Sequence, residues 1–131
     1  MNSTAISIII VGLLVGGLIV FSRPNDNSNT PSAPLVNNVS VEGKDQIVEI
    51  TAKGGYTPKV SAAKAEMPTI LRMKTQSTYD CTSSINIPTL GIKKILPSNG
   101  VTDISIPPQK LGTRLNVLCA MGMYTTAIDF N

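Results

Sequence analysis

The stretch "TRLNVLCAMGMYTTAIDF", residues 113–130, contains two segments of alternating apolar residues separated by a short loop. In the first segment Leu115, Val117 and Cys119 recur at every second position, and in the second Ile128 and Phe130 do the same. Side chains two residues apart on a β-strand share one face of the sheet. The stretch therefore predicts two strands, each with one buried face.

Similar short runs occur upstream of this stretch, and glycine or proline residues separate most of them. They cover residues 46–52, 57–63, 67–75, 83–92 and 101–108, and no segment shows the 3.6-residue period of a helix. Short strands at such spacing are typical of an all-β sandwich. We expect about seven strands in two antiparallel sheets between residues 46 and 131.

The first 45 residues differ in texture from the rest of the chain. Residues 5–21 form an uncharged apolar run, long enough as a helix to cross a bilayer. The preceding "MNST" has no basic residue, and no small-residue cleavage site follows, which favours an anchor over a cleaved signal peptide. We expect a transmembrane anchor at 1–22, a flexible Asn/Ser/Pro-rich linker at 23–45 and the β-domain at 46–131.

Composition excludes several classes of function. The chain has no histidine, so catalysis by Ser-His-Asp or Cys-His groups and sites that need histidine ligands cannot be built within it. Its net charge is +3 and its basic residues are scattered, without the basic stripe and stacking aromatics typical of nucleic-acid binding. We therefore expect neither an enzyme nor a nucleic-acid-binding protein.

Sulfur is concentrated after the first strand of the opening stretch. Cys119, Met121 and Met123 lie within five residues of one another. Thiolates and thioethers are soft donors that favour Cu(I) over Zn²⁺, Ca²⁺ or Mg²⁺. The second cysteine, Cys81, follows another predicted strand and completes a four-sulfur set if both loops lie at one end of the sandwich. Its neighbour Asp80 is a hard donor, and we expect it to form a turn.

The sequence spacing leaves three alternatives open for the two cysteines, namely a disulfide, a shared metal site or two free thiols. Two cysteines outside the cytoplasm commonly form a disulfide, and methionines commonly fill gaps in a core. A Cys81–Cys119 bridge predicts a disulfide-stapled interaction or sensor module without metal. A redox enzyme is less favoured, because the chain has no C-x-x-C motif and no evident base to lower a thiol pKa.

The ordered set of motifs from residue 46 to 131 resembles the small bacterial cupredoxin-like domains. That family is related to plastocyanin and azurin and to the N-terminal domain of the EfeO-type iron-uptake protein. The matching motifs consist of Gly55, Tyr56, Pro58, Cys81, Pro88, Leu90, Gly91, Ile92, Pro107, Gly112, Cys119, Met121, Gly122 and Met123. The resemblance implies a Greek-key β-sandwich with a ligand loop between its last two strands, located outside the cytoplasm.

The chain departs from this family in one respect, because the blue-copper members use two histidines and this chain has none. Fold and composition together imply a Cu(I) site formed by Cys81, Cys119, Met121 and Met123. The expected function is copper holding or transfer at the membrane surface. A single membrane anchor is expected to attach the domain, with a copper transporter or a metallochaperone as partner.

Overall fold

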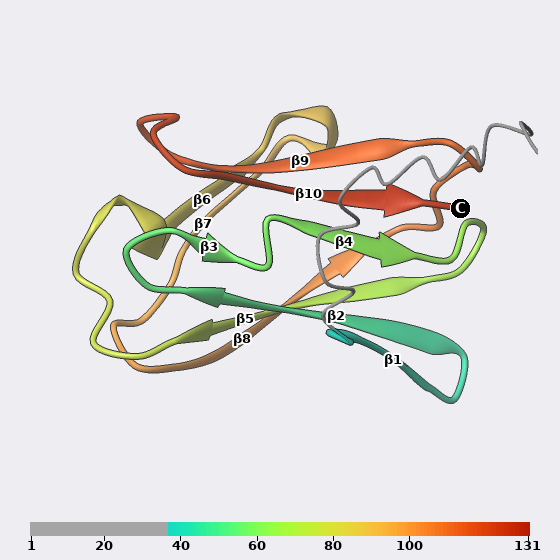
Figure 1. Ribbon diagram of the computed structural model, residues 1–131, viewed down its shortest axis with the longest axis horizontal. Helices are drawn as coiled ribbons and strands as arrows, with labels where there is room; N and C mark the ends of the chain where they lie inside the picture. Colours follow the sequence, from blue (N-terminus) through green and yellow to red (C-terminus); the bar gives the residue numbers. More distant parts are fainter. Residues whose placement is uncertain (1–36) are drawn as a thin grey trace, which may run out of the picture. The chain divides into compact units, whose positions relative to one another are not determined.

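The structure is a computed structural model that describes residues 37–131, and these residues form two β-sheets packed face to face (Figure 1). The first sheet contains β1 (Val39–Glu42), β2 (Asp45–Ala52), β3 (Tyr56–Thr57), β5 (Thr69–Thr75) and β8 (Gly100–Ile106). The second sheet contains β4 (Val60–Ala63), β6 (Ser84–Ile87), β7 (Ile92–Ile95), β9 (Arg114–Cys119) and β10 (Thr125–Phe130). Two short 3₁₀ turns, η1 (Cys81–Ser83) and η2 (Pro88–Leu90), complete the described elements.

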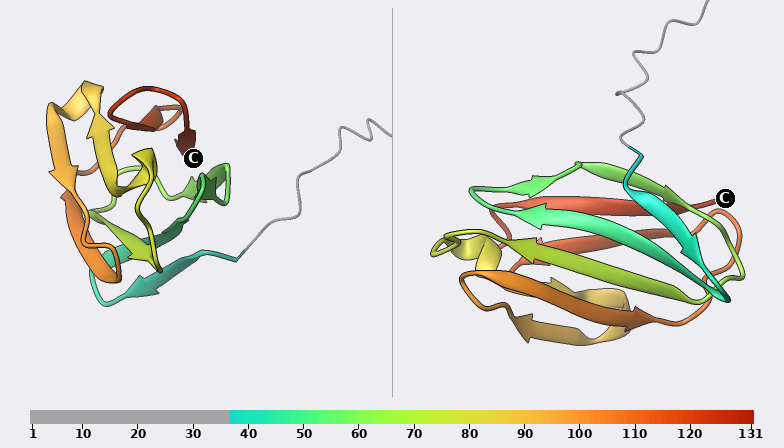
Figure 2. Two further views of the ribbon diagram at one scale, coloured as in Figure 1. Left: turned by 90° about the vertical axis from the view of Figure 1, so that its left-hand side faces the viewer. Right: turned by 90° about the horizontal axis from the view of Figure 1, so that it is seen from below.

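The predicted all-β sandwich is confirmed, and the alternating residues face its interior. Figure 2 shows the two layers of strands. The core between them consists mainly of aliphatic side chains, together with Met73, Cys119, Tyr56 and Phe130. In the first sheet Val48, Leu71 and Ile104 form one row across β2, β5 and β8, because Leu71 pairs with both of the others. The strands of the opening stretch, β9 and β10, pair antiparallel as expected.

Two predicted strands are each divided in the structure. The run 57–63 becomes the end of β3 and β4, with Pro58 between them, because proline has no N–H to continue a ladder. The run 83–92 becomes β6, η2 and β7. Pro88 begins η2, and Gly91 ends it in the left-handed conformation with a φ of 64°. These two divisions, together with the additional strand β1 before residue 46, give ten strands in the described residues in place of the expected seven.

The prediction that both sheets are antiparallel is wrong for two strand pairs. β2 and β5 run parallel with seven paired positions, and β4 and β10 also run parallel. The reason lies in the connections, because the chain leaves the first sheet after β3, passes along β4 in the second sheet and returns as β5. This crossover through the second sheet places β5 beside β2 in the same direction. A hairpin would make the two strands antiparallel.

The β-domain begins earlier than the expected boundary at residue 46. β1 lies within the range expected for the linker and pairs with β2, so that Val39 lies opposite Val48. The predicted anchor at 1–22 and the first part of the predicted linker lie outside the described residues. Among residues 37–131, no helix is long and apolar enough to cross a bilayer.

The fold brings the ends of several elements together at one pole of the sandwich. The β9–β10 loop and η1 both lie at the left of Figure 1, opposite the β1–β2 hairpin and the C-terminus. We call this end the sulfur pole and define it by Cys81, Cys119, Met121 and Met123.

Candidate metal centre

Cys119 is the last residue of β9, and its side chain is buried with 1 % exposure. Its N–H donates to the carbonyl of Tyr124 at 3.0 Å, and its carbonyl accepts from the N–H of Gly122 at 2.9 Å. Gly122 has a φ of 71°, a conformation that glycine adopts without strain. The loop is therefore a tight turn, as expected from the glycine between the two methionines.

The two loop methionines are exposed rather than packed in the core. Met121 is 75 % exposed and Met123 is 64 % exposed, whereas Met73 of β5 is fully buried. An apolar side chain gains free energy by leaving water, so this degree of exposure does not serve packing. The open alternative, that these two residues fill gaps in the core, is wrong.

Cys81 is the first residue of η1 and is half-buried against the core. Asp80 caps this turn by accepting hydrogen bonds from the Thr82 N–H, at 2.8 Å, and from the Thr82 hydroxyl. Its other carboxylate oxygen accepts from the N–H of Gly54 at 2.7 Å. The Thr82 hydroxyl and N–H, followed by the Gly54 N–H, hold the pKa of Asp80 below its usual value. Asp80 is thus a turn former, as expected.

Tyr56 holds η1 from the inner side of the domain. Its ring is fully buried and its hydroxyl donates to the carbonyl of Thr82 at 3.4 Å. Burial, and to a smaller extent the charge of Asp80, raises the pKa of Tyr56 to about 12, so the phenol stays protonated as a donor. The sequence analysis did not predict that Tyr56 and Gly54 fix this turn. The local part of the arrangement, an Asp two positions before a Thr, is a recognisable capping signal.

Cys81 and Cys119 form a disulfide, with their Cα atoms 5.6 Å apart and a sequence separation of 38 residues. The sequence left open a bridge, a metal site or two free thiols, and it required both cysteines to lie at one end for a shared site. That requirement is met. In the bridged form neither sulfur is a thiolate, and a thiolate is the form that binds a metal.

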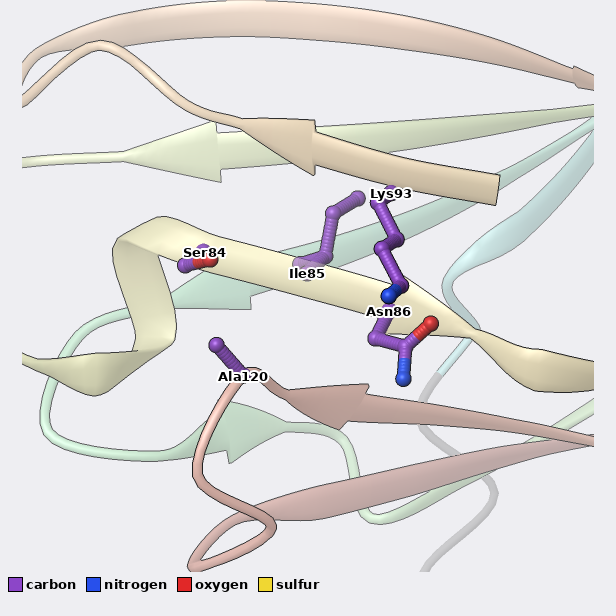
Figure 3. Close-up of a pocket in the computed structure, with 5 residues that line it drawn as sticks. All are labelled: Ser84, Ile85, Asn86, Lys93 and Ala120. Carbon is purple, nitrogen blue, oxygen red and sulfur yellow. The ribbon is translucent and has the colours of Figure 1, made fainter. Parts of the chain in front are cut away.

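The surroundings of the sulfur pole supply no competing hard-ligand site. Within residues 37–131, no group of three or more His, Cys, Asp or Glu side chains lies close enough to hold a metal. A small pocket of about 120 Å³ beside the loop is lined by Ser84, Ile85, Asn86, Lys93 and Ala120 (Figure 3). It contains no carboxylate or sulfur. The Ala120 N–H donates to the carbonyl of Ser84 at 3.0 Å and ties the loop to β6.

The donor set at this pole fits a soft metal ion when the Cys81–Cys119 disulfide is reduced. Once the bridge is reduced, the chain offers two thiols and two exposed thioethers within two adjoining segments, 81–83 and 119–123. These are ligands suited to Cu(I). Without histidine they do not suit the His₂Cys geometry of blue copper sites.

Solved structures of two other proteins have a similar fold. One is the metal-binding domain of the Cu(I)-exporting P-type ATPase CopA of Streptococcus pneumoniae D39, determined with Cu(I). It is 23% identical with a TM-score of 0.63, and the match covers 71% of this chain and 92% of that one. The other is a copper binding protein in its apo form, 20% identical with a TM-score of 0.65, where the match covers 71% and 94% of the two chains. At these identities the likeness shows the fold alone.

The sequence of most of the chain matches one protein family. No curated protein matches the chain in sequence. The profile of the family described as Cupredoxin-like domain matches residues 14–128, which include almost all of the sandwich. With its two-sheet fold and its loop between the last two strands, the chain belongs to the family of cupredoxin-like domains.

Proposed function

We propose that the reduced protein binds Cu(I) through Cys81, Cys119, Met121 and Met123, and holds this ion or passes it to another protein. The observation that carries the proposal is the contact between Cys81 and Cys119 at the pole where the two methionines are exposed. Two thiolates with neighbouring thioethers form a soft donor set, and such sets select Cu(I).

Copper is the cargo best supported by the family and the donor chemistry together. The CopA domain was solved with Cu(I), and the second similar structure is described as a copper binding protein. Ca²⁺ and Mg²⁺ require several oxygen ligands, and structural zinc sites require four ligands, mostly cysteine thiolates and histidine nitrogens. A pair of thiols with two thioethers satisfies neither requirement.

The difference in exposure among the four sulfurs supports transfer of the ion. Cys119 is buried, Cys81 is half-buried, and Met121 and Met123 are open to solvent. An incoming protein can therefore displace the thioethers first and the thiolates afterwards. Tyr79 and Ile95, each 81 % exposed, offer further apolar surface to a copper transporter or a metallochaperone as partner. Tyr79 lies two residues before Cys81, and Ile95 pairs with Ser84.

The proposal includes a location outside the cytoplasm, with residues 1–22 as a single membrane anchor. The uncharged apolar run at 5–21 supports an anchor. The Cys81–Cys119 bridge supports an oxidising compartment, where disulfides form and persist. Protease treatment of intact cells tests the location, because degradation of the domain without lysis is expected and its protection would contradict the proposal.

The binding experiment uses the full chain in mild detergent, reduced and freed of reductant without oxygen, and titrated with Cu(I) against a colorimetric Cu(I) chelator. We expect about one Cu(I) per chain for one four-sulfur set. Cys119→Ser abolishes uptake because it removes a buried thiolate. Met121→Leu combined with Met123→Leu weakens binding about tenfold or more, which is about 1.4 kcal/mol.

Met67→Leu is the matched control, because Met67 belongs to the segment between β4 and β5. Figure 1 shows this connection at the end of the sandwich opposite the β9–β10 loop. Unchanged Cu(I) binding is expected for this variant. Equal weakening in Met67→Leu and in the loop double variant would contradict a site at the sulfur pole.

A second candidate function is favoured by the disulfide itself, namely a stapled interaction or sensor module without metal. The bridge joins η1 to the end of β9 and requires no metal to do so. A bridge that resists mild reductant, together with no Cu(I) uptake by the fully reduced chain, would select this function over copper binding.

A further inference from the structure

We infer that the Cys81–Cys119 pair reduces cupric ion, and that the disulfide in the structure is the oxidised product of this reaction. The inference rests on the proposed copper function and extends it from holding Cu(I) to producing it. The substrate is Cu(II), and the electron donor is the dithiol form of the pair.

The electron balance of the step is simple. The two thiols lose two protons and two electrons as the bond between the sulfur atoms forms. Each of two Cu(II) ions accepts one electron and becomes Cu(I). The protons pass to solvent. Return to the dithiol requires an external dithiol reductant, which acts by thiol–disulfide exchange.

The geometry of the oxidised form is the first support. The Cα atoms of Cys81 and Cys119 are 5.6 Å apart, within the range that a disulfide requires. The hydrogen bonds that place both residues come from the rest of the fold. Asp80 and Tyr56 hold η1, and the Tyr124 carbonyl holds the end of β9. The scaffold therefore presents the two sulfurs to each other.

The second support is that the side chains around the cysteine pair suit Cu(I) better than Cu(II). Cu(II) prefers nitrogen and oxygen donors, whereas Cu(I) prefers thiolate and thioether donors. The chain has no histidine, and the carboxylate that adjoins Cys81 in sequence, Asp80, is occupied by hydrogen bonds from Thr82 and Gly54. The sulfur pole thus stabilises the reduced ion and offers little to the oxidised one. Such a ligand set favours electron transfer to copper.

The third support is the exposure of the methionines. A thioether has no proton to lose and forms no disulfide, so Met121 and Met123 remain soft ligands after both cysteines are oxidised. Both lie in the loop that begins directly after Cys119 and are open to solvent. They are therefore the groups that retain Cu(I) as the thiolates are consumed.

The experiment mixes the reduced full chain, in mild detergent and without oxygen, with an excess of Cu(II) sulfate. Loss of the Cu(II) signal is followed by electron paramagnetic resonance, and thiols are counted after quenching in denaturant with a chelator. We expect loss of both thiols, reduction of two Cu(II) per chain, and a product that remains a monomer on a non-reducing gel. The same chain oxidised beforehand is the blank and is expected to reduce no copper.

Variants separate the methionine contribution from general thiol oxidation. Met121→Leu combined with Met123→Leu is expected to slow the reaction about tenfold, equivalent to about 1.4 kcal/mol. Met67→Leu is expected to leave the rate unchanged. Thiols that persist beside an undiminished Cu(II) signal would overturn the inference. Oxidation only to intermolecular dimers, or equal rates in both methionine variants, would also overturn it.

A parallel Cu(I) titration of the reduced chain distinguishes failure of this inference from failure of the proposed function. Uptake of Cu(I) without reduction of Cu(II) contradicts the inference and leaves the proposed function standing. Absence of Cu(I) uptake contradicts the proposed function and the inference that rests on it.

Discussion

Gln46 is a fully buried polar side chain whose hydrogen-bonding groups are all directed to partners on neighbouring segments. Its amide nitrogen donates to the Lys64 carbonyl at 2.7 Å and to the Thr69 hydroxyl at 2.9 Å, while its oxygen accepts from the Lys64 N–H at 2.8 Å. Buried polar groups are tolerated when they are paired in this way. The residue thereby joins the start of β2 to the segment after β4.

Replacing Gln46 by Leu is expected to lower the free energy of unfolding by about 2 kcal/mol, because it leaves the Lys64 backbone groups and the Thr69 hydroxyl without their partner. Urea unfolding with an unchanged m-value measures this loss. The control is Gln76→Leu, at an exposed glutamine, for which we expect little change. Equal unfolding midpoints for the two variants would contradict the role given to Gln46.

Arg72 and Asp103 lie opposite each other on β5 and β8 and form two hydrogen bonds of 2.9 Å. The hydrogen bond from Arg72, followed by its charge, holds the pKa of Asp103 below its usual value. A carboxylate with a lowered pKa in the folded state stabilises the fold above its unfolded pKa of about 3.9. That stabilisation is lost as the pH falls through the folded value.

Asp103→Asn is therefore expected to unfold at lower urea concentration than the parent at pH 7, by a small margin because the pair is exposed. The difference between the urea midpoints of variant and parent is expected to become smaller below about pH 4. Urea titrations at several pH values provide the measurement. Asp129→Asn is the comparison, because Asp129 meets Arg114 through a single contact of 3.3 Å, and a smaller effect is expected. A difference in urea midpoint between parent and Asp103→Asn that grows in acid would contradict this interpretation.

The clustering of soft side chains near the end of β9 is visible in the sequence, but the pairing of Cys119 with Cys81 is not. Soft side chains at 119, 121 and 123 are visible as a local pattern, and so is the glycine that tightens the loop. A bridge to Cys81 depends on the long-range path that brings η1 beside β9, and spacing carries no information on that path. The hold of Tyr56 on η1 is equally non-local, because it acts across 26 residues of sequence.

At the scale of elements, local alternation predicted the strands but not the two parallel pairs among them. Leu71 with Met73 and Ile85 with Ile87 share buried faces as their two-residue period requires. The parallel pairing of β2 with β5 depends on the passage through β4 in the other sheet, which leaves no local signature. The division of 83–92 follows from Pro88, which has no N–H for the ladder and begins η2.

β7 is an edge strand of the second sheet, and it carries Lys93 and Lys94 at its centre, both exposed. Charged residues on an edge strand prevent pairing with a strand of another molecule. Lys93→Thr combined with Lys94→Val is therefore expected to produce dimers and larger aggregates, which light scattering over a concentration series detects.

The control for the edge-strand prediction removes the same charge from lysines outside the strands. Lys44→Thr with Lys110→Val changes a turn and a loop, and this variant is expected to scatter like the parent. If both double variants aggregate equally, net charge rather than the edge of β7 governs solubility.

At the scale of the whole molecule, the disulfide closes a loop that passes through both sheets. The segment between Cys81 and Cys119 contains β6 and β7 of the second sheet, β8 of the first and β9 of the second. In the chain-entropy model, a closed loop of this length stabilises a fold by about 4 kcal/mol at 25 °C. Reduction of the bridge therefore changes the stability of the sandwich as well as the ligands of the sulfur pole.

Cu(I) is expected to restore part of that stability, because an ion held by Cys81 and Cys119 joins the same two segments that the disulfide joins. We expect the reduced, metal-free chain to unfold at a clearly lower urea concentration than the oxidised chain. Cu(I) at about a hundred times its dissociation constant is expected to return about 2.7 kcal/mol by mass action. The variant with both Cys81→Ser and Cys119→Ser should respond to neither reductant nor Cu(I). Equal stabilisation of this variant by Cu(I) would show that the ion binds elsewhere, since no thiolate remains to connect η1 to β9.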